Sequence, residues 1–148
     1  MIERQVARPS GRLAGVHVLV VEDDADSASV LATALEYYGA WVTVAPSPRI
    51  GLMLLRTMMP RVLVVATSPA SGDGVPLLRV VRAFERARGG RIATLALSAD
   101  RDDSIGETAA IAGFHECLAK PVNPAEFCRV VARLATRFLE ARYADRGR

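Results

Sequence analysis

The stretch Val-Leu-Val-Val-Glu-Asp-Asp at residues 18–24 decides the fold of this chain. Its apolar half belongs to a run from Val16 to Val21 that is rich in β-branched residues and too short for a free-standing helix. Such a run predicts a strand that is buried on both faces of a sheet. The acidic residues that follow lead into an amphipathic segment, which stops at Gly39. The stretch therefore predicts a buried strand, an acidic loop and a helix.

The same unit of strand and helix recurs along the chain. Further strands are predicted at residues 41–45, 62–66, 92–97 and 117–119, and further helices at residues 48–59, 75–88, 102–112 and 124–142. Ser47 and Asn123, each followed by proline, are typical helix N-caps. Five alternations without a hairpin signal predict an α/β domain with a doubly wound parallel sheet. In such a sheet, the functional crevice lies at the carboxyl ends of the strands.

The composition fits one domain. The chain has 148 residues, of which 51% are hydrophobic, enough for a single core. We expect residues 1–14 to be an N-terminal tail, residues 15–140 the domain, and residues 141–148 a tail that extends the last helix. No apolar run is long enough to cross a membrane, so we expect a soluble, cytoplasmic protein without a membrane partner. The cysteines and histidines show no zinc or redox spacing.

The charges are nearly balanced. Nineteen basic residues against 16 acidic ones give a formal net charge of +3, which is too even to predict nucleic-acid binding. The basic residues are arginines with one exception. The only lysine is Lys120, directly before Pro121.

Polar and small residues stand where the predicted strands end: Glu22 and Asp23, Ala66, Ser98, and Lys120. The stretch 18–24, Leu-Ser-Ala at 97–99 and Leu-Ala-Lys-Pro at 118–121 together resemble the receiver domain of response regulators, in order and in spacing, over residues 15–139. The resemblance implies a flavodoxin-like (βα)5 fold with the strand order 2-1-3-4-5. It also implies a place in a two-component phosphorelay.

The resemblance assigns roles to individual residues. Receivers hold magnesium with an acidic pair and with an aspartate after the third strand, which then accepts a phosphoryl group. Glu22 and Asp23 match the acidic pair, Ser98 matches the hydroxyl that holds the phosphate, and Lys120 with Pro121 matches the lysine and its cis-proline turn.

The acceptor aspartate has no counterpart, because Ala66 stands in its place. A methyl group cannot attack phosphorus and offers no ligand to a metal. We therefore expect no phosphorylation, weak or no Mg²⁺ binding, no other cofactor and no enzymatic activity. Two further departures indicate natural divergence rather than an engineered alanine: Ala70 replaces the usual proline, and Cys117 replaces the aromatic switch residue.

Several alternatives remain open from the sequence. Thr67, Ser68 or Asp73 would be the substitute acceptors of a receiver that is still phosphorylated. The acidic residues 22–24 would also serve as a plain helix cap, and Lys120 would then pair with Asp23. A third alternative is a small-ligand or nucleotide-binding flavodoxin-like domain, although no glycine-rich loop follows the first strand.

The last predicted helix has a second face besides its apolar stripe. Arg129, Arg133 and Arg137 recur on it at intervals of four residues, which indicates either a solvated face or a contact surface. The interpretation that we favour is a stand-alone, phosphorylation-independent interaction module. Its partner would be a histidine kinase, a phosphotransfer protein or another regulator. A homodimer would form through helix 102–112, strand 117–119 and the last helix.

Overall fold

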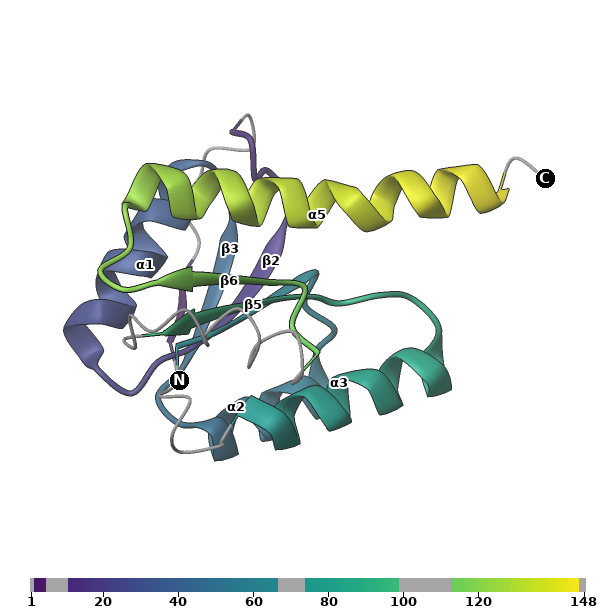
Figure 1. Cartoon of the computed structure of the whole chain (residues 1–148), viewed down its shortest axis with the longest axis horizontal. Helices are drawn as coiled ribbons and strands as arrows, with labels where there is room; N and C mark the ends of the chain where they lie inside the picture. Colours follow the sequence, from purple (N-terminus) through teal and green to yellow (C-terminus); the bar gives the residue numbers. More distant parts are fainter. Residues whose placement is uncertain (1, 5–10, 67–73, 99–112, 147–148) are drawn as a thin grey trace.

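A parallel sheet flanked by helices forms the body of the protein (Figure 1). The computed structural model describes residues 2–4, 11–66, 74–98 and 113–146, with side chains for residues 11–66, 76–98 and 113–138. Its strands are β1 (Ile2–Arg4), β2 (His17–Val21), β3 (Trp41–Ala45), β4 (Val62–Val65), β5 (Ala93–Ser98) and β6 (Glu116–Ala119). Its helices are α1 (Ala25–Tyr37), α2 (Pro48–Thr57), α3 (Gly74–Arg88) and α5 (Pro124–Arg146).

The order of the sheet is β1-β3-β2-β4-β5-β6. The five strands from β2 to β6 run parallel. Numbered along the chain without β1, they stand in the order 2-1-3-4-5, so the predicted flavodoxin-like fold is confirmed. The strand bounds agree with the predicted ones to within one residue.

The central strands are buried on both faces, as their nearly continuous apolar runs predict. In β2, Val18 and Val20 join the core cluster that includes side chains of α1 and α5. Leu19 and Val21, which point the other way, join the cluster that includes side chains of α2 and α3. The two helix layers therefore pack on opposite faces of the sheet, and Figure 1 shows α1 and α5 on one side and α2 and α3 on the other.

Local caps set where the helices begin. The Ser47 side chain accepts a hydrogen bond from the Ile50 N–H at the start of α2, and Asn123 Oδ1 accepts from the N–H groups of Ala125 and Glu126 at the start of α5. Both caps were predicted. Helix α5 continues to Arg146, and its C-terminal turns extend well beyond the sheet in Figure 1.

The N-terminal segment differs from the prediction of a tail. Residues 2–4 form β1, which pairs antiparallel with β3 and makes the sheet six-stranded rather than five-stranded. Leu13 is fully buried, and its N–H donates to the Tyr38 carbonyl at 2.8 Å. This part of the chain therefore belongs to the domain, because it covers the edge of β3 and the end of α1.

Two further points concern the extent of the chain. The helix predicted at residues 102–112 lies outside the described residues. Gly113, which was predicted to end it, is described and lies in a turn with a positive φ. Within the part that the structure describes, no helix combines the length and the apolar character needed to span a membrane.

Candidate functional site

The parallel register brings the four predicted positions to one edge of the sheet. Val21 lies beside Val65, and Ser98 lies beside Ala119. The Ala66 N–H donates to the Val21 carbonyl at 2.9 Å, and the Lys120 N–H donates to the Ser98 carbonyl at 2.7 Å. Glu22, Ala66, Ser98 and Lys120 therefore follow strands whose carboxyl ends are hydrogen-bonded side by side, as predicted.

An ion pair between Lys120 and Glu22 lies at the centre of this edge. Lys120 Nζ is 3.1 Å from Glu22 Oε2, and the Glu22 side chain is only 1% exposed. The other oxygen, Oε1, accepts a hydrogen bond from the Asp24 N–H at 3.1 Å. Both oxygens of the buried carboxylate are thus satisfied within the chain, which a buried charge requires.

The partner of Lys120 corrects the alternative drawn from the sequence, in which Lys120 pairs with Asp23. Asp23 is exposed, whereas Glu22 is buried at the end of β2. Since adjacent residues at a strand end point to different sides, only one of the two faces the lysine. The buried carboxylate needs a cation more than the solvated one does.

The acidic loop also caps α1, as one of the alternatives proposed. The Asp24 side chain accepts hydrogen bonds from the hydroxyl and the N–H of Ser27, at 2.6 Å and 3.0 Å. These two bonds hold the pKa of the Asp24 carboxyl below its usual range. Of the three acidic residues, Asp24 caps the helix. Glu22 pairs with Lys120, and Asp23 is exposed to solvent.

The side chains described at this edge offer few free oxygen ligands to a Mg²⁺ ion. Ala66 is 5% exposed, and its methyl group belongs to the core cluster that also includes side chains of α1 and α5. It supplies no oxygen, and the oxygens of Glu22 already bind Lys120 and Asp24. Among the described side chains, no three of the His, Cys, Asp or Glu type gather where they could hold a metal.

Comparison with known proteins identifies the family. The sequence pattern of the response regulator receiver domain matches residues 18–132. The chain belongs to the response regulator receiver domain family. This receiver is 36% identical over 126 residues to an uncharacterized 14.6 kDa protein from the sodA1 3' region of Leptolyngbya boryana, covering 85% of this chain and 95% of that one.

Solved structures agree with the family. A putative response regulator from Chloroflexus aurantiacus is 27% identical, with a TM-score of 0.72 over 82% of this chain and 98% of that one. The receiver domain of Ssk1 from Saccharomyces cerevisiae is 17% identical, with a TM-score of 0.71 over 82% of this chain and 89% of that one, and shows the shared fold alone.

Other family positions also lie at this edge of the receiver. The Ser98 side chain is buried, and the peptide bond between Lys120 and Pro121 is cis, as the resemblance implied. Cys117, at the switch position, lies half-buried in β6, and burial raises the pKa of its thiol. The half-buried thiol has neither the size nor the shape of the aromatic ring found at this position in the family.

A groove runs from this edge along α1. Its volume is about 550 Å³, and its polar lining comes from Glu22, Asp26, Ser27 and Lys120. Its apolar lining comes from Val30, Leu31, Leu97, Pro121 and Val122. A groove of this size and lining falls in the range of small-ligand sites.

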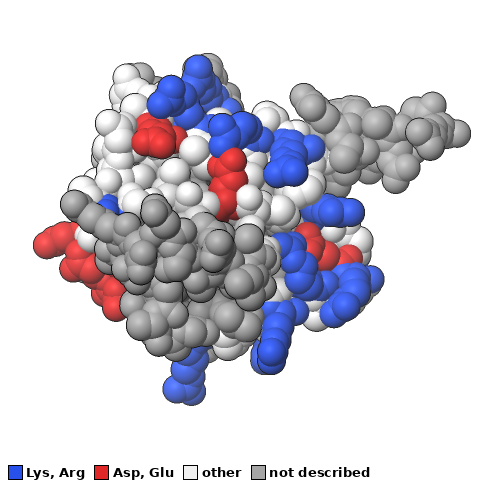
Figure 2. Space-filling view, viewed as in Figure 1, with Lys and Arg blue, Asp and Glu red and all other residues white. Residues whose placement is uncertain are grey.

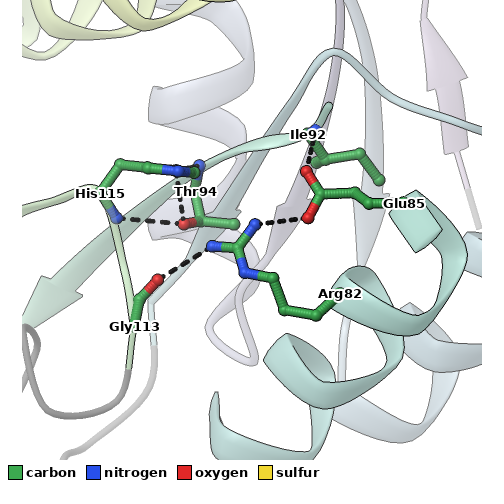
Figure 3. Close-up of polar contacts among 6 residues, drawn as sticks. All are labelled: Arg82, Glu85, Ile92, Thr94, Gly113 and His115. Carbon is green, nitrogen blue, oxygen red and sulfur yellow. Dashed lines mark hydrogen bonds and ion pairs between the residues drawn. The ribbon is translucent and has the colours of Figure 1, made fainter. Parts of the chain in front are cut away.

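A polar network at the opposite end of the sheet was not predicted (Figure 3). His115 Nδ1 accepts a hydrogen bond from the Thr94 N–H at 2.9 Å. Arg82, on α3, pairs with Glu85 at 2.7 Å and donates to the Gly113 carbonyl at 2.9 Å. The spacing of Arg82 and Glu85 on a predicted helix was a usable signal for their pair, whereas the bonds to strand and loop depend on tertiary structure.

The surroundings of His115 disfavour the charged form of its ring. Burial, followed by the positive charges of Arg82 and Arg137, lowers the pKa of its ring. The ring also packs against Phe138 of α5, with the centroids 5.0 Å apart. His115 therefore joins β5 to the last helix through its contacts with Thr94 and Phe138.

The predicted arginine face of α5 is exposed. Arg129, Arg133 and Arg137 all reach solvent, and Arg133 pairs with Glu116 of β6. Figure 2 shows basic side chains gathered along α5 and on the α3 side of the receiver, with acidic ones where α1 begins. The exposure is confirmed, and whether the face contacts a partner stays a prediction.

The buried ion pair generates the first testable prediction. We expect Lys120→Met to lower the free energy of unfolding by about 3 kcal/mol, because it leaves the Glu22 carboxylate buried without a cation. The double variant Glu22→Gln/Lys120→Met should recover most of that loss, since no charge is then buried. Urea unfolding at neutral pH measures the free energy of unfolding of the wild type, the two single variants and the double variant, which together form a double-mutant cycle. A Lys120→Met protein as stable as the wild type, or a double variant no better than Lys120→Met, would contradict the assignment.

Proposed function

We propose that this receiver acts in two-component signalling as a phosphorylation-independent protein-interaction module without catalytic activity. The observation that carries the proposal is Ala66, which is buried and stands where the family resemblance places the acceptor aspartate. Phosphoryl transfer needs a nucleophile in line with the donor and charges that stabilise the transferred group. The first of these is missing at residue 66.

The arrangement of Lys120 supports the same conclusion. In a phosphorylated receiver, the matching lysine holds a phosphoryl oxygen, whereas here the ammonium group binds the buried Glu22 carboxylate. The resemblance assigns this site two carboxylates, Glu22 and Asp23, and one lysine, whereas a complete site has three carboxylates and one lysine. With fewer oxygen ligands and less negative charge to compensate, we propose weak or no Mg²⁺ binding.

The proposed partners are a histidine kinase, a phosphotransfer protein or another regulator. In the solved yeast complex, the receiver domain of Ssk1 is bound to the histidine phosphotransfer protein Ypd1. A surface of the same fold is available here, and we propose a cytoplasmic location, where such partners act. The predicted homodimer face includes β6 and α5, while its helix at 102–112 lies outside the described residues.

Two rival functions remain distinguishable. The substitute acceptors Thr67, Ser68 and Asp73 lie outside the described residues, so phosphorylation at one of them is tested by mass rather than by geometry. The groove along α1 favours a small ligand with an apolar body as a second candidate. A ligand that saturates this groove and raises the melting temperature would support that candidate.

The missing acceptor generates the second prediction. We expect the wild type to gain no phosphoryl mass from acetyl phosphate with Mg²⁺, and Ala66→Asp to gain it in part. The third carboxylate should attract the ion, and Ser98 and Lys120 remain at hand to hold the phosphoryl oxygens. Intact-mass spectrometry measures the gain, with Ala66→Asp/Lys120→Ala as the control that should lose it. A stable phosphorylated fraction in the wild type would overturn the proposed function.

The exposed arginines generate the third prediction. Replacing Arg129, Arg133 and Arg137 with glutamine should weaken capture of a cognate kinase or phosphotransfer protein by at least ten-fold, because exposed arginines contribute to recognition. The melting temperature should stay within a few degrees, since exposed charges stabilise the fold little. Biolayer interferometry measures capture, and Arg49→Gln/Arg56→Gln on α2 is the control. Unchanged capture by the triple variant would show that this face is only solvated.

A further inference from the structure

Charges of opposite sign are segregated along this chain. Between Arg12 and Arg49 there is no lysine or arginine, and the acidic residues of that interval lie in or just before α1. The segment from residue 74 to residue 98 holds five arginines and a single acidic residue, Glu85. In Figure 2, red side chains accordingly gather where α1 begins, while blue ones gather on the α3 side. The two sides of one molecule are thus complementary in charge.

The acidic side includes an apolar stripe on α1. Asp26, Val30, Thr33 and Tyr37 recur at intervals of four, three and four residues, so they lie on one face of the helix, and all four are exposed. The exposed fractions of Val30 and Tyr37 are 58% and 70%, high for an apolar and an aromatic side chain on the same helix face. Tyrosine is enriched where proteins contact one another.

The basic side includes a matching stripe on α3. Pro76, Arg79, Ala83 and Arg86 lie on one exposed face of that helix, at intervals of three, four and three residues. In the described part of the chain, neither Arg79 nor Arg86 pairs with an acidic side chain. Small Ala83 leaves room between the two arginines for a larger side chain from outside.

The two stripes match residue for residue when the helices run antiparallel. Asp26 then faces Arg86, and Val30 faces the small Ala83. Farther along, Thr33 faces Arg79, and Tyr37 faces Pro76. The register holds to within one residue, or about 1.5 Å, over the whole length. The antiparallel arrangement also places the beginning of one helix beside the end of the other, which their dipoles favour.

We propose that the occupant of each stripe is a second copy of this chain, joined head to tail. Helix α1 covers one face of the sheet and α3 covers the other, as their places in the two core clusters show. The stripes therefore cannot meet within one molecule. A contact between two different surfaces repeats from copy to copy, so the receivers form open stacks rather than a closed dimer.

The stack has a consequence for the proposed function but does not depend on it. Val30 lines both the α1 stripe and the groove that begins at Glu22 and Lys120. A neighbouring α3 would cover that wall of the groove, so stacked copies would hide it. The contact involves two helix faces only, which makes it small and weak, with a dissociation constant on the order of 100 µM.

Sedimentation velocity tests the proposal on the full chain. At low salt, the weight-average sedimentation coefficient of the wild type should rise continuously from micromolar to millimolar concentration. High salt should suppress the rise, because screening shortens the reach of the Asp26 and Arg86 charges. Asp26→Arg and Arg86→Glu should each abolish the rise, since each places like charges opposite one another.

The decisive experiment exchanges the charges of residues 26 and 86. The double variant Asp26→Arg/Arg86→Glu restores opposite charges across the contact and should regain the stacking of the wild type. Arg56→Glu, an exposed arginine of α2 outside both stripes, is the matched control and should stack normally. Melting temperatures of all variants confirm that each one is folded.

The contrary results are equally clear. A wild type that stays monomeric at low salt, or that saturates at twice the monomer mass, would overturn the head-to-tail stack. So would single variants that still stack, or a double variant that does not regain stacking. None of these results bears on the tests of phosphorylation or of partner capture. Ala66, on which the first depends, and the α5 arginines, on which the second depends, are unchanged in every variant.

Discussion

The ion pair between Lys120 and Glu22 is the interaction on which the functional edge of this receiver depends. It joins the end of β2 to the end of β6 across residues 98 apart in the sequence. A carboxylate buried as deeply as Glu22 must be paired, and Lys120 is the only lysine of the chain. Pro121 and the start of α5 come soon after this lysine in the chain, and both members of the ion pair line the groove.

On the function that we propose, the pair also explains how the receiver fold persists without an acceptor aspartate. In a complete receiver site, a metal ion offsets the repulsion of three clustered carboxylates. Here the methyl group of Ala66 joins the core, and the remaining buried carboxylate is neutralised from within. The buried carboxylate of this edge is therefore balanced in charge, and we propose binding, rather than chemistry, as the source of the signal.

Much of the fold followed from the sequence, and the exceptions have physical reasons. Residues 18–21 of β2 and all of β4 are apolar because both faces are covered, and that pattern is readable without a structure. A three-residue edge strand such as β1 carries no comparable pattern. The choice of Glu22 over Asp23 depends on which side chain turns inward at the strand end, and the Thr94 contact of His115 depends on packing between distant segments.

The most direct test uses the fact that the chain has a single lysine. In a proton–nitrogen NMR spectrum of side-chain ammonium groups, Lys120 should give one signal, protected from exchange by its bond to Glu22. We expect this signal to stay in place when Mg²⁺ and acetyl phosphate are added, separately or together. In Glu22→Gln, the signal should shift, or broaden because the ammonium protons exchange faster with water. A saturable shift of the wild-type signal on adding Mg²⁺ and acetyl phosphate would contradict the account, because it would show the lysine leaving the carboxylate for a phosphoryl group.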